Sequence, residues 1–277
     1  YSPNGGGMTR NQVSVGDAVN AIQSAGGTPA FDALAAALFY QPDPAALGAT
    51  YDSLSGEGIG GALQAAISGD DLFFSTVGRQ GDYWRLQGLD GQGAALRLDQ
   101  FAAAASAQPG SSDAVQTATG AAGTQRFGRD GLRRWGTGYG AVYRQPGDAA
   151  QGSADLSYNI KGFAGGIESE IKPDLLGGLA LGASWSDYSV PDRATSGSLK
   201  AVNAAGYLVG QAGRFYATGL VGLSAAWGEE QRAAVIPEVP GPQPPIPGFS
   251  EMLEADFNTT SVMGRFETGV RFDLGAV

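Results

Sequence analysis

The chain has 277 residues, and its composition excludes several functional classes. With 27 acidic and 17 basic side chains it carries a formal net charge of -10 at pH 7, whereas binding to a nucleic-acid backbone depends on clustered Lys and Arg. The sequence contains no cysteine and no histidine, which excludes disulfides, thiolate and imidazole metal sites, and a Ser-His-Asp triad. No apolar run approaches the ~18 residues of a membrane helix. We therefore expect no cofactor, no metal and no nucleic-acid partner.

Residues 9–78 are predicted to be helical. Thr28 and Asp43 each precede a proline, which is the pattern of an N-cap followed by Pro at the first helical position. Residues 62–67 and 71–77 are weaker helix candidates. Each candidate has one apolar stripe, so the short helices are expected to pack on one another.

Residues 79–132 have a different composition. Ala, Gly, Ser, Gln and Thr dominate this stretch, and it contains few large apolar side chains that a core could bury. Such a composition is typical of a linker with at most one weak helix.

From Arg133 onward the apolar residues alternate with a period of two, which predicts β-strands. The second of these strands has apolar residues of both parities, and a bulge would reconcile them. The predicted strands are residues 133–143, 157–171, 178–185, 201–210, 214–228 and 260–273.

The connections between these strands alternate in length. Residues 144–156, 187–200 and 229–248 form long connections, and residues 172–175 and 211–214 form short ones. Long loops outside the cell and short turns in the periplasm are the pattern of an outer-membrane β-barrel. A soluble sandwich gives no reason for this alternation. The predicted fold is therefore a helical segment followed by antiparallel strands of a transmembrane barrel.

The alternation also suggests which face of each strand meets lipid. Within RRWGTGYGAVYR (residues 133–144), aromatic side chains occupy one face and glycines the other. In a membrane barrel an aromatic face suits lipid and the interfacial girdle, and a small or polar face suits the lumen. An Arg on the lipid face costs about 2–4 kcal/mol at mid-membrane, so the charged strand residues are expected to face the lumen.

This reasoning yields two sets of predicted positions. The lipid-facing or girdle residues are predicted to be Trp135, Tyr139, Tyr143, Trp185, Phe215, Trp227, Phe266 and Phe272. The lumen-facing residues are predicted to be Arg134, Glu168, Glu170, Arg265, Glu267 and Arg271. The alternative is a soluble meander whose aromatic face packs on the helical part, but that fold gives no reason for Arg265 and Glu267 to share a face.

An ordered set of motifs resembles the translocator region of the monomeric autotransporters, secreted proteins of Gram-negative bacteria. The set covers nearly all of residues 9–277 and consists of YDSLSGE (51–57), RRWGTGYG (133–140), KGFAGGIE (161–168), LLGGLALGASWSDYSV (175–190), GYLVGQAGRFYATGLVGLSAAWG (206–228) and GFSEMLEADFNTTSVMGRFETGVRFDLGA (248–276). The resemblance implies a barrel of about twelve strands, within the range of known outer-membrane barrels, and a helical segment in the pore before the first strand.

The resemblance also implies a domain order and a function. Residues 9–78 would be the helical segment, residues 79–132 the linker or the segment that lies in the pore, and residues 133–277 the first half of the barrel. Such a protein would use type V secretion: it anchors in the outer membrane and exports or displays an upstream passenger at the cell surface, without catalysis by this chain. Its implied partners are outer-membrane lipid, the passenger, periplasmic chaperones and the barrel-insertion machinery.

Six predicted strands are fewer than the eight of the smallest outer-membrane barrels. The family also ends in a strand with a terminal aromatic residue, whereas the last residues here are DLGAV. We therefore expect the native chain to continue beyond Val277. Three other functions remain open: a passive porin, the anchor of an upstream surface enzyme or adhesin, and a soluble binding module.

Other motifs have simpler explanations. Gly56, Gly58 and Gly61 match the spacing of a dinucleotide-binding loop, but no strand precedes them, so they are expected to punctuate a helix. Glu168 and Glu170 could form a carboxylate pair for acid–base work or Ca²⁺, but polar lumen lining is the ordinary role of such residues in a barrel.

Overall fold

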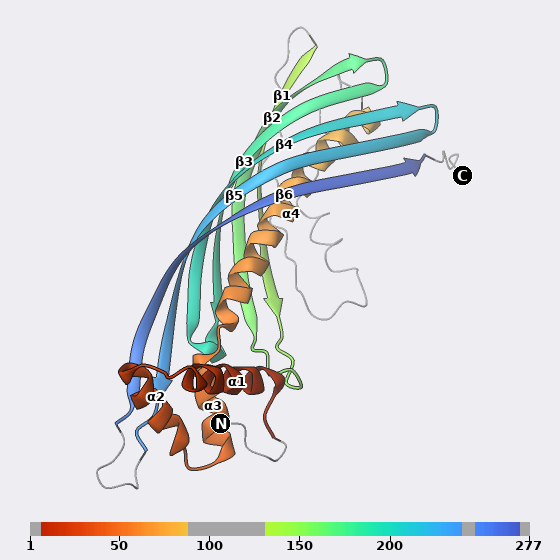
Figure 1. Cartoon of the computed structure of the whole chain (residues 1–277). Coiled ribbons are helices and arrows are strands. Elements are labelled where there is room, and N and C mark those ends of the chain that lie inside the picture. The colour runs from red at the N-terminus through yellow and green to blue at the C-terminus, as the bar shows by residue number, and fades with distance from the viewer. Residues whose placement is uncertain (1–6, 88–130, 240–246, 272–277) are drawn as a thin grey trace.

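The structure is a computed structural model that describes residues 7–87, 131–239 and 247–271. Within these ranges four α-helices precede six strands that form one antiparallel sheet, with neighbours in chain order (Figure 1). The helices are α1 (Arg10–Ser24), α2 (Pro29–Phe39), α3 (Pro44–Leu54) and α4 (Glu57–Gln87). The strands are β1 (Leu132–Gln145), β2 (Leu156–Lys172), β3 (Leu175–Val190), β4 (Thr195–Ala212), β5 (Phe215–Ile236) and β6 (Phe249–Val270).

The first three helices begin at residues that cap them. The side chain of Thr28 accepts a hydrogen bond from the backbone N–H of Phe31 at 3.2 Å, and that of Asp43 accepts from Ala46 at 2.8 Å. A proline follows each cap at a position where its missing N–H costs nothing. The two helix starts predicted from sequence are therefore confirmed.

Helices α1, α2 and α3 share a small core of their own. Val19, Leu38 and Tyr51, one from each helix, are buried together. This packing agrees with the expectation that short amphipathic helices cover one another's apolar stripes.

Helix α4 differs from the prediction. Two weak helices were expected within residues 62–77, but α4 is continuous and ends at Gln87, inside the range assigned to a linker. It packs on the sheet instead of on the other helices. Glycines weaken an isolated helix, but here Gly61 and Gly81 lie so close to Leu156 and Val209 that a side chain would not fit. Tertiary packing thus stabilises a helix that its own sequence supports only weakly. Residues 88–130, the rest of the expected linker, lie outside the described ranges.

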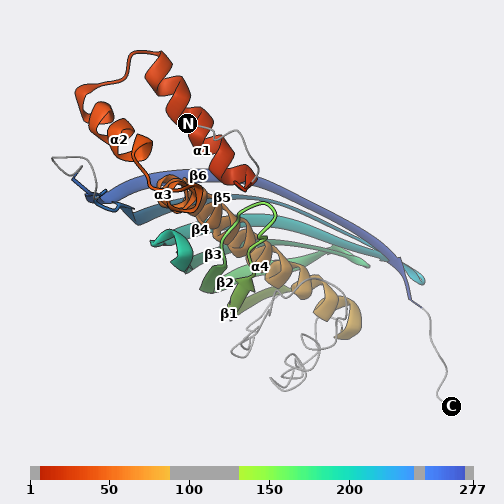
Figure 2. The ribbon, with the colours of Figure 1, turned by 90° about the horizontal axis from the view of Figure 1, so that it is seen from below.

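The sheet is curved, and α4 lies lengthwise along its concave face (Figures 1 and 2). We call the side of the sheet that faces α4 the inner face and the convex side the outer face. The short connections β2–β3 and β4–β5 lie at one end of the sheet, which we call the turn end. The connections β1–β2, β3–β4 and β5–β6 lie at the other, which we call the loop end.

Two sequence-based details of the strands are wrong. The connection expected over residues 187–200 is mostly strand, because β3 and β4 pair in register as far as Val190 and Thr195. Only the short 3-10 helix η1 (Pro191–Arg193) and one further residue join the two strands. The pairing of β2 with β1 runs without a shift, and the irregularity in its pairing with β3 lies between Glu170 and Lys172, too far along the strand to reverse the facing between Ile160 and Phe163. Its apolar residues of both parities have another explanation: α4 covers one face, and the other face is an exposed apolar surface.

The inner face of the sheet is built from aromatic residues placed opposite glycines. Trp135 pairs with Gly166 and Tyr139 with Gly162, and a Cβ at those glycines would lie 2.7 Å and 2.6 Å from the facing ring. Rings that cover a cross-strand glycine protect its backbone and set the register. The same arrangement occurs in Tyr207 over Gly178, Tyr188 over Gly197, Tyr216 over Gly269 and Phe257 over Gly228.

This arrangement corrects the facing predicted for β1. Trp135 and Tyr139 are buried against α4, and Tyr143 stacks on Tyr158 of the inner face with ring centroids 4.6 Å apart. They are therefore not lipid-facing. The intervening residue Arg134 is exposed on the outer face, opposite to its predicted side. An alternating pattern has two faces but carries no information about which is inside.

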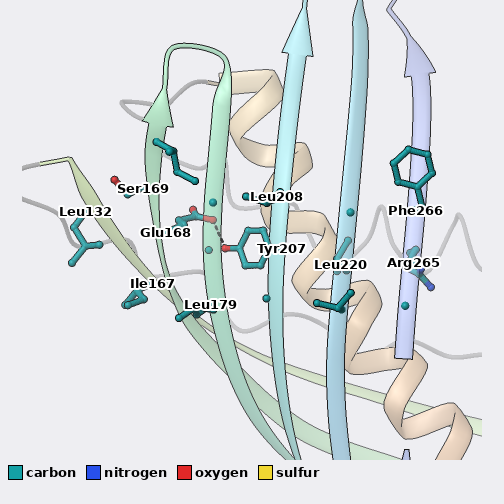
Figure 3. A pocket seen from close by; sticks show the side chains of 17 residues that line it. Leu132, Ile167, Glu168, Ser169, Leu179, Tyr207, Leu208, Leu220, Arg265 and Phe266 are labelled. Atoms are coloured by element: carbon teal, nitrogen blue, oxygen red, sulfur yellow. Dashed lines mark hydrogen bonds between the residues drawn. The ribbon is translucent and has the colours of Figure 1, made fainter. Parts of the chain in front are cut away.

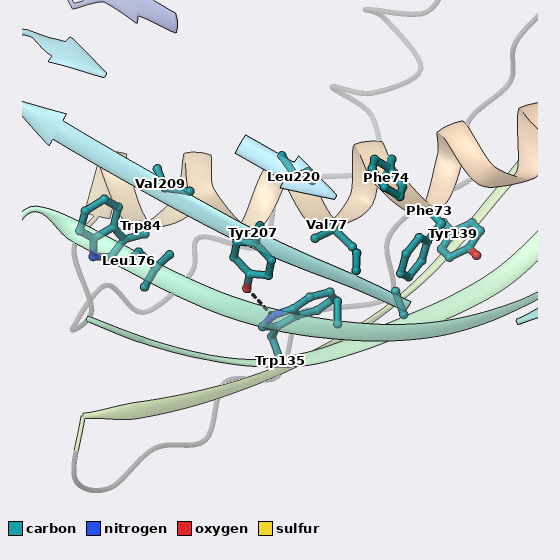
Figure 4. Packing of buried hydrophobic residues seen from close by; sticks show 13 residues of the cluster. Phe73, Phe74, Val77, Trp84, Trp135, Tyr139, Leu176, Tyr207, Val209 and Leu220 are labelled. Carbon is teal, nitrogen blue, oxygen red and sulfur yellow. Dashed lines mark hydrogen bonds between the residues drawn. The ribbon is translucent and has the colours of Figure 1, made fainter. Parts of the chain in front are cut away.

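The main core lies between α4 and the inner face (Figure 4). Phe73, Phe74, Val77 and Trp84 of α4 are buried among strand residues that include Trp135, Tyr139, Leu176, Tyr207, Val209 and Leu220. Gly182 and Gly222 make room for this helix: a Cβ at these positions would lie 2.6 Å from the ring of Phe73 and 2.8 Å from that of Phe74.

We expect Gly182→Val to destabilise the folded chain by about 1–3 kcal/mol, because the added side chain would displace Phe73 from its site. Thermal unfolding of the detergent-solubilised native protein would measure the change. Gly219→Val is the matched control, since a Cβ added at Gly219 would have no other atom within 4 Å. Equal stability of the two variants would contradict this account of the core.

Candidate functional site

The candidate site is the interface between α4 and the inner face of the sheet. α4 begins at the loop end, beside α1–α3, and runs to the turn end (Figure 1). Polar and charged side chains attach it to the sheet at three levels: the loop end, the middle of the sheet and the turn end.

At the loop end, Glu57 and Arg193 join α4 to two connections of the sheet. Arg193 Nε donates to Glu57 Oε2 at 2.8 Å, and a second guanidinium nitrogen donates to the carbonyl of Gly152 at 2.6 Å. Glu57 Oε1 accepts from the backbone N–H of Ala154 at 2.8 Å. Arg193 is only 8% exposed, so these charge-assisted hydrogen bonds are shielded from water and stronger than surface ones.

Helix α3 is attached to β5 at the same end. Arg232 donates to the carbonyls of Leu54 and Ser55, the residues at the end of α3. The hydroxyl of Ser53 accepts from the backbone N–H of Val235 at 2.7 Å. Because the last carbonyls of a helix have no partner within the helix, Arg232 satisfies groups that would otherwise be unpaired. The three N-terminal helices thus rest on the loop end of the sheet.

At the middle level, Asp70 is a buried carboxylate at the helix–sheet interface. Its Oδ1 accepts from Asn203 Nδ2 at 3.0 Å and its Oδ2 from the hydroxyl of Ser261 at 2.6 Å. The next residue, Asp71, forms an ion pair with Arg265 of β6 at 2.8 Å, and Arg265 also donates to the hydroxyl of Ser75. These contacts connect α4 to β4 and β6 at once.

Toward the turn end, Trp84 Nε1 donates to Glu170 Oε1 at 2.8 Å, which joins α4 to β2. Arg85 lies over the ring of Tyr216 at 3.6 Å, within the range of a cation–π contact. Arg271 donates to the backbone carbonyl of Arg85 at 2.6 Å. The C-terminal part of α4 is therefore held by β2, by β5 and by the residue that follows β6.

A buried ion pair lies beneath α4 on the inner face. Arg133 of β1 pairs with Glu168 of β2, both almost fully buried. Tyr207 donates to the second oxygen of Glu168, and Trp135 Nε1 donates to the Tyr207 hydroxyl at 3.1 Å (Figures 3 and 4). Sequence reasoning missed Arg133, although it shares the parity of Trp135 and therefore had to lie on the same face.

Most of the predicted lumen-facing residues contact α4 or its neighbours. Glu168, Glu170, Arg265 and Arg271 make the contacts described above, and Glu267 accepts from the hydroxyl of Tyr216 at 2.8 Å. Arg134 is the exception, because its side chain makes no hydrogen bond or ion pair with any residue of the described ranges. Among the predicted lipid-facing residues, the following are exposed: Trp185, Phe215, Trp227 and Phe266. Phe272 lies outside the described residues.

The outer face is apolar and carries a shallow hollow of about 890 Å³ near the turn end. Figure 3 shows residues that line it from strands β1 to β6, among them Ile167, Leu179, Leu208 and Phe266. An exposed apolar surface of this extent marks a contact with a partner or with lipid. No helix of the described residues is long and apolar enough to cross a membrane.

A catalytic or metal role for the two glutamates of β2 finds no support in their contacts. Glu168 is occupied by Arg133 and Tyr207, and Glu170 by Trp84. Within the part of the chain that the structure describes, no three acidic, His or Cys residues are grouped as metal ligands. Both glutamates attach elements of the fold to each other.

Replacing Glu168 with Ala should lower the free energy of unfolding by about 3–5 kcal/mol, because it leaves Arg133 buried without a counter-charge. Chemical denaturation of the detergent-solubilised native protein would give this value. The double variant Arg133→Leu/Glu168→Leu, which removes both charges, should recover most of the loss. Glu267→Ala, at an exposed position of the same face, is the control, and an effect as large as that of Glu168→Ala would contradict the role of burial.

Comparison with known proteins agrees with this architecture. A family model described as the Autotransporter beta-domain matches residues 134–277, more than half of the chain, and so confirms the resemblance seen in the sequence. No curated protein and no solved structure matches the chain significantly. The matched domain is an outer-membrane β-barrel that serves translocation, which accounts for the apolar outer face and the polar contacts inside. The chain belongs to the autotransporter β-domain family.

Proposed function

We propose that this chain exports an upstream passenger through the outer membrane and then anchors it at the cell surface, with α4 as the segment that stays in the pore. The observation that carries the proposal is the position of α4, which follows the inner face from the loop end to the turn end and is attached at three levels. A segment that only preceded the barrel would have no reason for such contacts.

The orientation follows from the connections. In outer-membrane barrels the longer loops are extracellular and the short turns periplasmic. α4 enters at the loop end, so everything upstream of Glu57, including α1–α3, would lie outside the cell. A passenger preceding residue 1 would then already be at the surface, and α1–α3 would be a folded collar between it and the barrel.

The partners and the chemistry follow from this arrangement. We infer that the outer face contacts lipid, that periplasmic chaperones accompany the chain before insertion, and that the barrel-insertion machinery receives its strands. About twelve strands, within the range of known barrels, would close the pore around α4. Any catalytic activity would belong to the passenger, so that the role of this chain is transport and attachment.

A passive porin is the main alternative, and the same interface argues against it. Phe73, Phe74, Val77 and Trp84 of α4 occupy the concave side of the sheet, where a diffusion channel would need water. A porin would also have no use for the helices α1–α3 at its loop end. The pore proposed here is therefore closed to solutes unless α4 leaves it.

The orientation can be tested with an epitope tag placed before residue 1 and a second tag inserted in the β2–β3 turn. Protease added to intact cells should remove the first tag and leave the second intact, because the turn would face the periplasm. Digestion of both tags only after the outer membrane is permeabilised would refute surface display. A known periplasmic protein serves as the control for membrane integrity.

Conductance of the native protein in planar bilayers would test the position of α4. Asp70→Ala should make open events at least about tenfold more frequent, because two hydrogen bonds to a charged group are lost, each worth about 1.5–3 kcal/mol. Asp70→Asn, which keeps an acceptor for Asn203, should show a smaller increase. Val221→Ala on the outer face is the control. Low and identical conductance in all variants, and in a form lacking residues 1–87, would place α4 outside the pore.

A further inference from the structure

One row of the outer face combines lysine and tryptophan in strict alternation. Lys161 of β2 lies opposite Trp185 of β3, Trp185 lies opposite Lys200 of β4, and Lys200 lies opposite Trp227 of β5. All four side chains are exposed, Trp185 by 40% and Trp227 by 54%. We call these four residues the lysine–tryptophan row.

The composition of this row is unlike that of the rest of the chain. The sequence has three lysines and four tryptophans, and two of each lie in this row. The acidic chain, with its net charge of -10, thus concentrates cations of one type in one place. The side chains of Lys161 and Lys200 make no hydrogen bond or ion pair with any residue that the structure describes, so both ammonium groups are available to a ligand.

The row marks a boundary between apolar and polar surface. The adjacent row toward the turn end is Phe163, Ala183, Val202 and Ala225, and the adjacent row toward the loop end is Asn159, Asp187, Ser198, Glu229 and Asp256. Trp at such a boundary places its ring among acyl chains and its N–H near the headgroups. Lys extends its apolar stem along the same surface and keeps its charge at the headgroup level.

We propose that the lysine–tryptophan row binds the phosphate groups of an anionic glycolipid in the outer leaflet of the outer membrane. The inference rests on the orientation given under the proposed function, in which the loop end is extracellular. Strands lie ~4.8 Å apart, so two strand spacings separate the two lysines by about 10 Å at their Cα atoms. Their long side chains can therefore reach one diphosphorylated headgroup together, while Trp185 between them packs on its acyl chains.

The acidic row limits how the lipid can bind. Asp187, Glu229 and Asp256 repel phosphate unless a divalent cation lies between them. Direct binding by the two lysines needs no such cation, so it should survive a chelator. Binding through carboxylate-held cations would be abolished by one. This difference separates the lysine site from simple cation bridging.

The test uses the native protein purified from outer membranes in detergent and titrated with diphosphoryl lipid A in the presence of EDTA. Quenching of tryptophan fluorescence by brominated lipid reports binding next to Trp185 and Trp227. For the double variant Lys161→Gln/Lys200→Gln we expect roughly thirtyfold weaker binding, the effect of two cations near an anionic lipid surface. Inorganic phosphate and a dephosphorylated lipid A should not compete.

The matched control is Lys172→Gln/Arg214→Gln, which removes the same charge at the turn end, where both residues are exposed. This variant should bind lipid A as the wild type does. Unchanged binding by Lys161→Gln/Lys200→Gln, equal weakening in both double variants, or loss of wild-type binding in EDTA would each overturn the proposal. An unfolding temperature equal to that of the wild type shows that each variant is folded. The protease test of orientation is independent, so a failure of the proposed function would be recognised separately.

Discussion

The contact between α4 and the concave face of the sheet is the constraint on which the rest of the structure depends. The six strands are rich in glycine and no second sheet covers them within residues 7–87, 131–239 and 247–271, so the helix supplies apolar side chains of the core. Glycines on both partners allow the approach: Gly182 and Gly222 accept the rings of Phe73 and Phe74, and Gly81 lies against Val209. Close-packed interiors tolerate neither gaps nor added atoms, which explains why small and large residues are matched across this interface.

The polar contacts serve a different purpose from the apolar core. Apolar packing alone would let a helix slide or rotate along a smooth surface, whereas Glu57, Asp70 and Trp84 each have a specific partner at one level of the sheet. Buried carboxylates are costly unless they are fully paired. The positions of these polar residues therefore specify where along the sheet α4 lies, which under the proposed function would fix the place of the segment that stays in the pore.

The two faces of the sheet have different surroundings, and the residue composition of each face matches what it contacts. The inner face combines aromatic rings, facing glycines and charged residues that reach α4. The outer face is apolar over most of its area and ends in Trp185 and Trp227 near the loop end. The buried pair of Arg133 and Glu168 lies on the inner side, where protein partners satisfy it, whereas the exposed side chains of Arg134 and Arg144 in β1 have no hydrogen-bond or ion-pair partner in the described ranges.

The sequence by itself determined the helix starts at Thr28 and Asp43 and the existence and order of the strands, because capping and period-two alternation are local signals. The family was indicated by the resemblance of an ordered set of motifs, which the family model confirms. Only the tertiary structure decided which face of β1 is inside, since alternation separates the two faces of a strand but does not say which of them is buried. It also decided that α4 is one helix, because glycines that weaken a lone helix become favourable where a strand packs against them. Local sequence patterns cannot predict long-range contacts such as that of Asp70 with Ser261, because these contacts form only when the helix lies against the sheet.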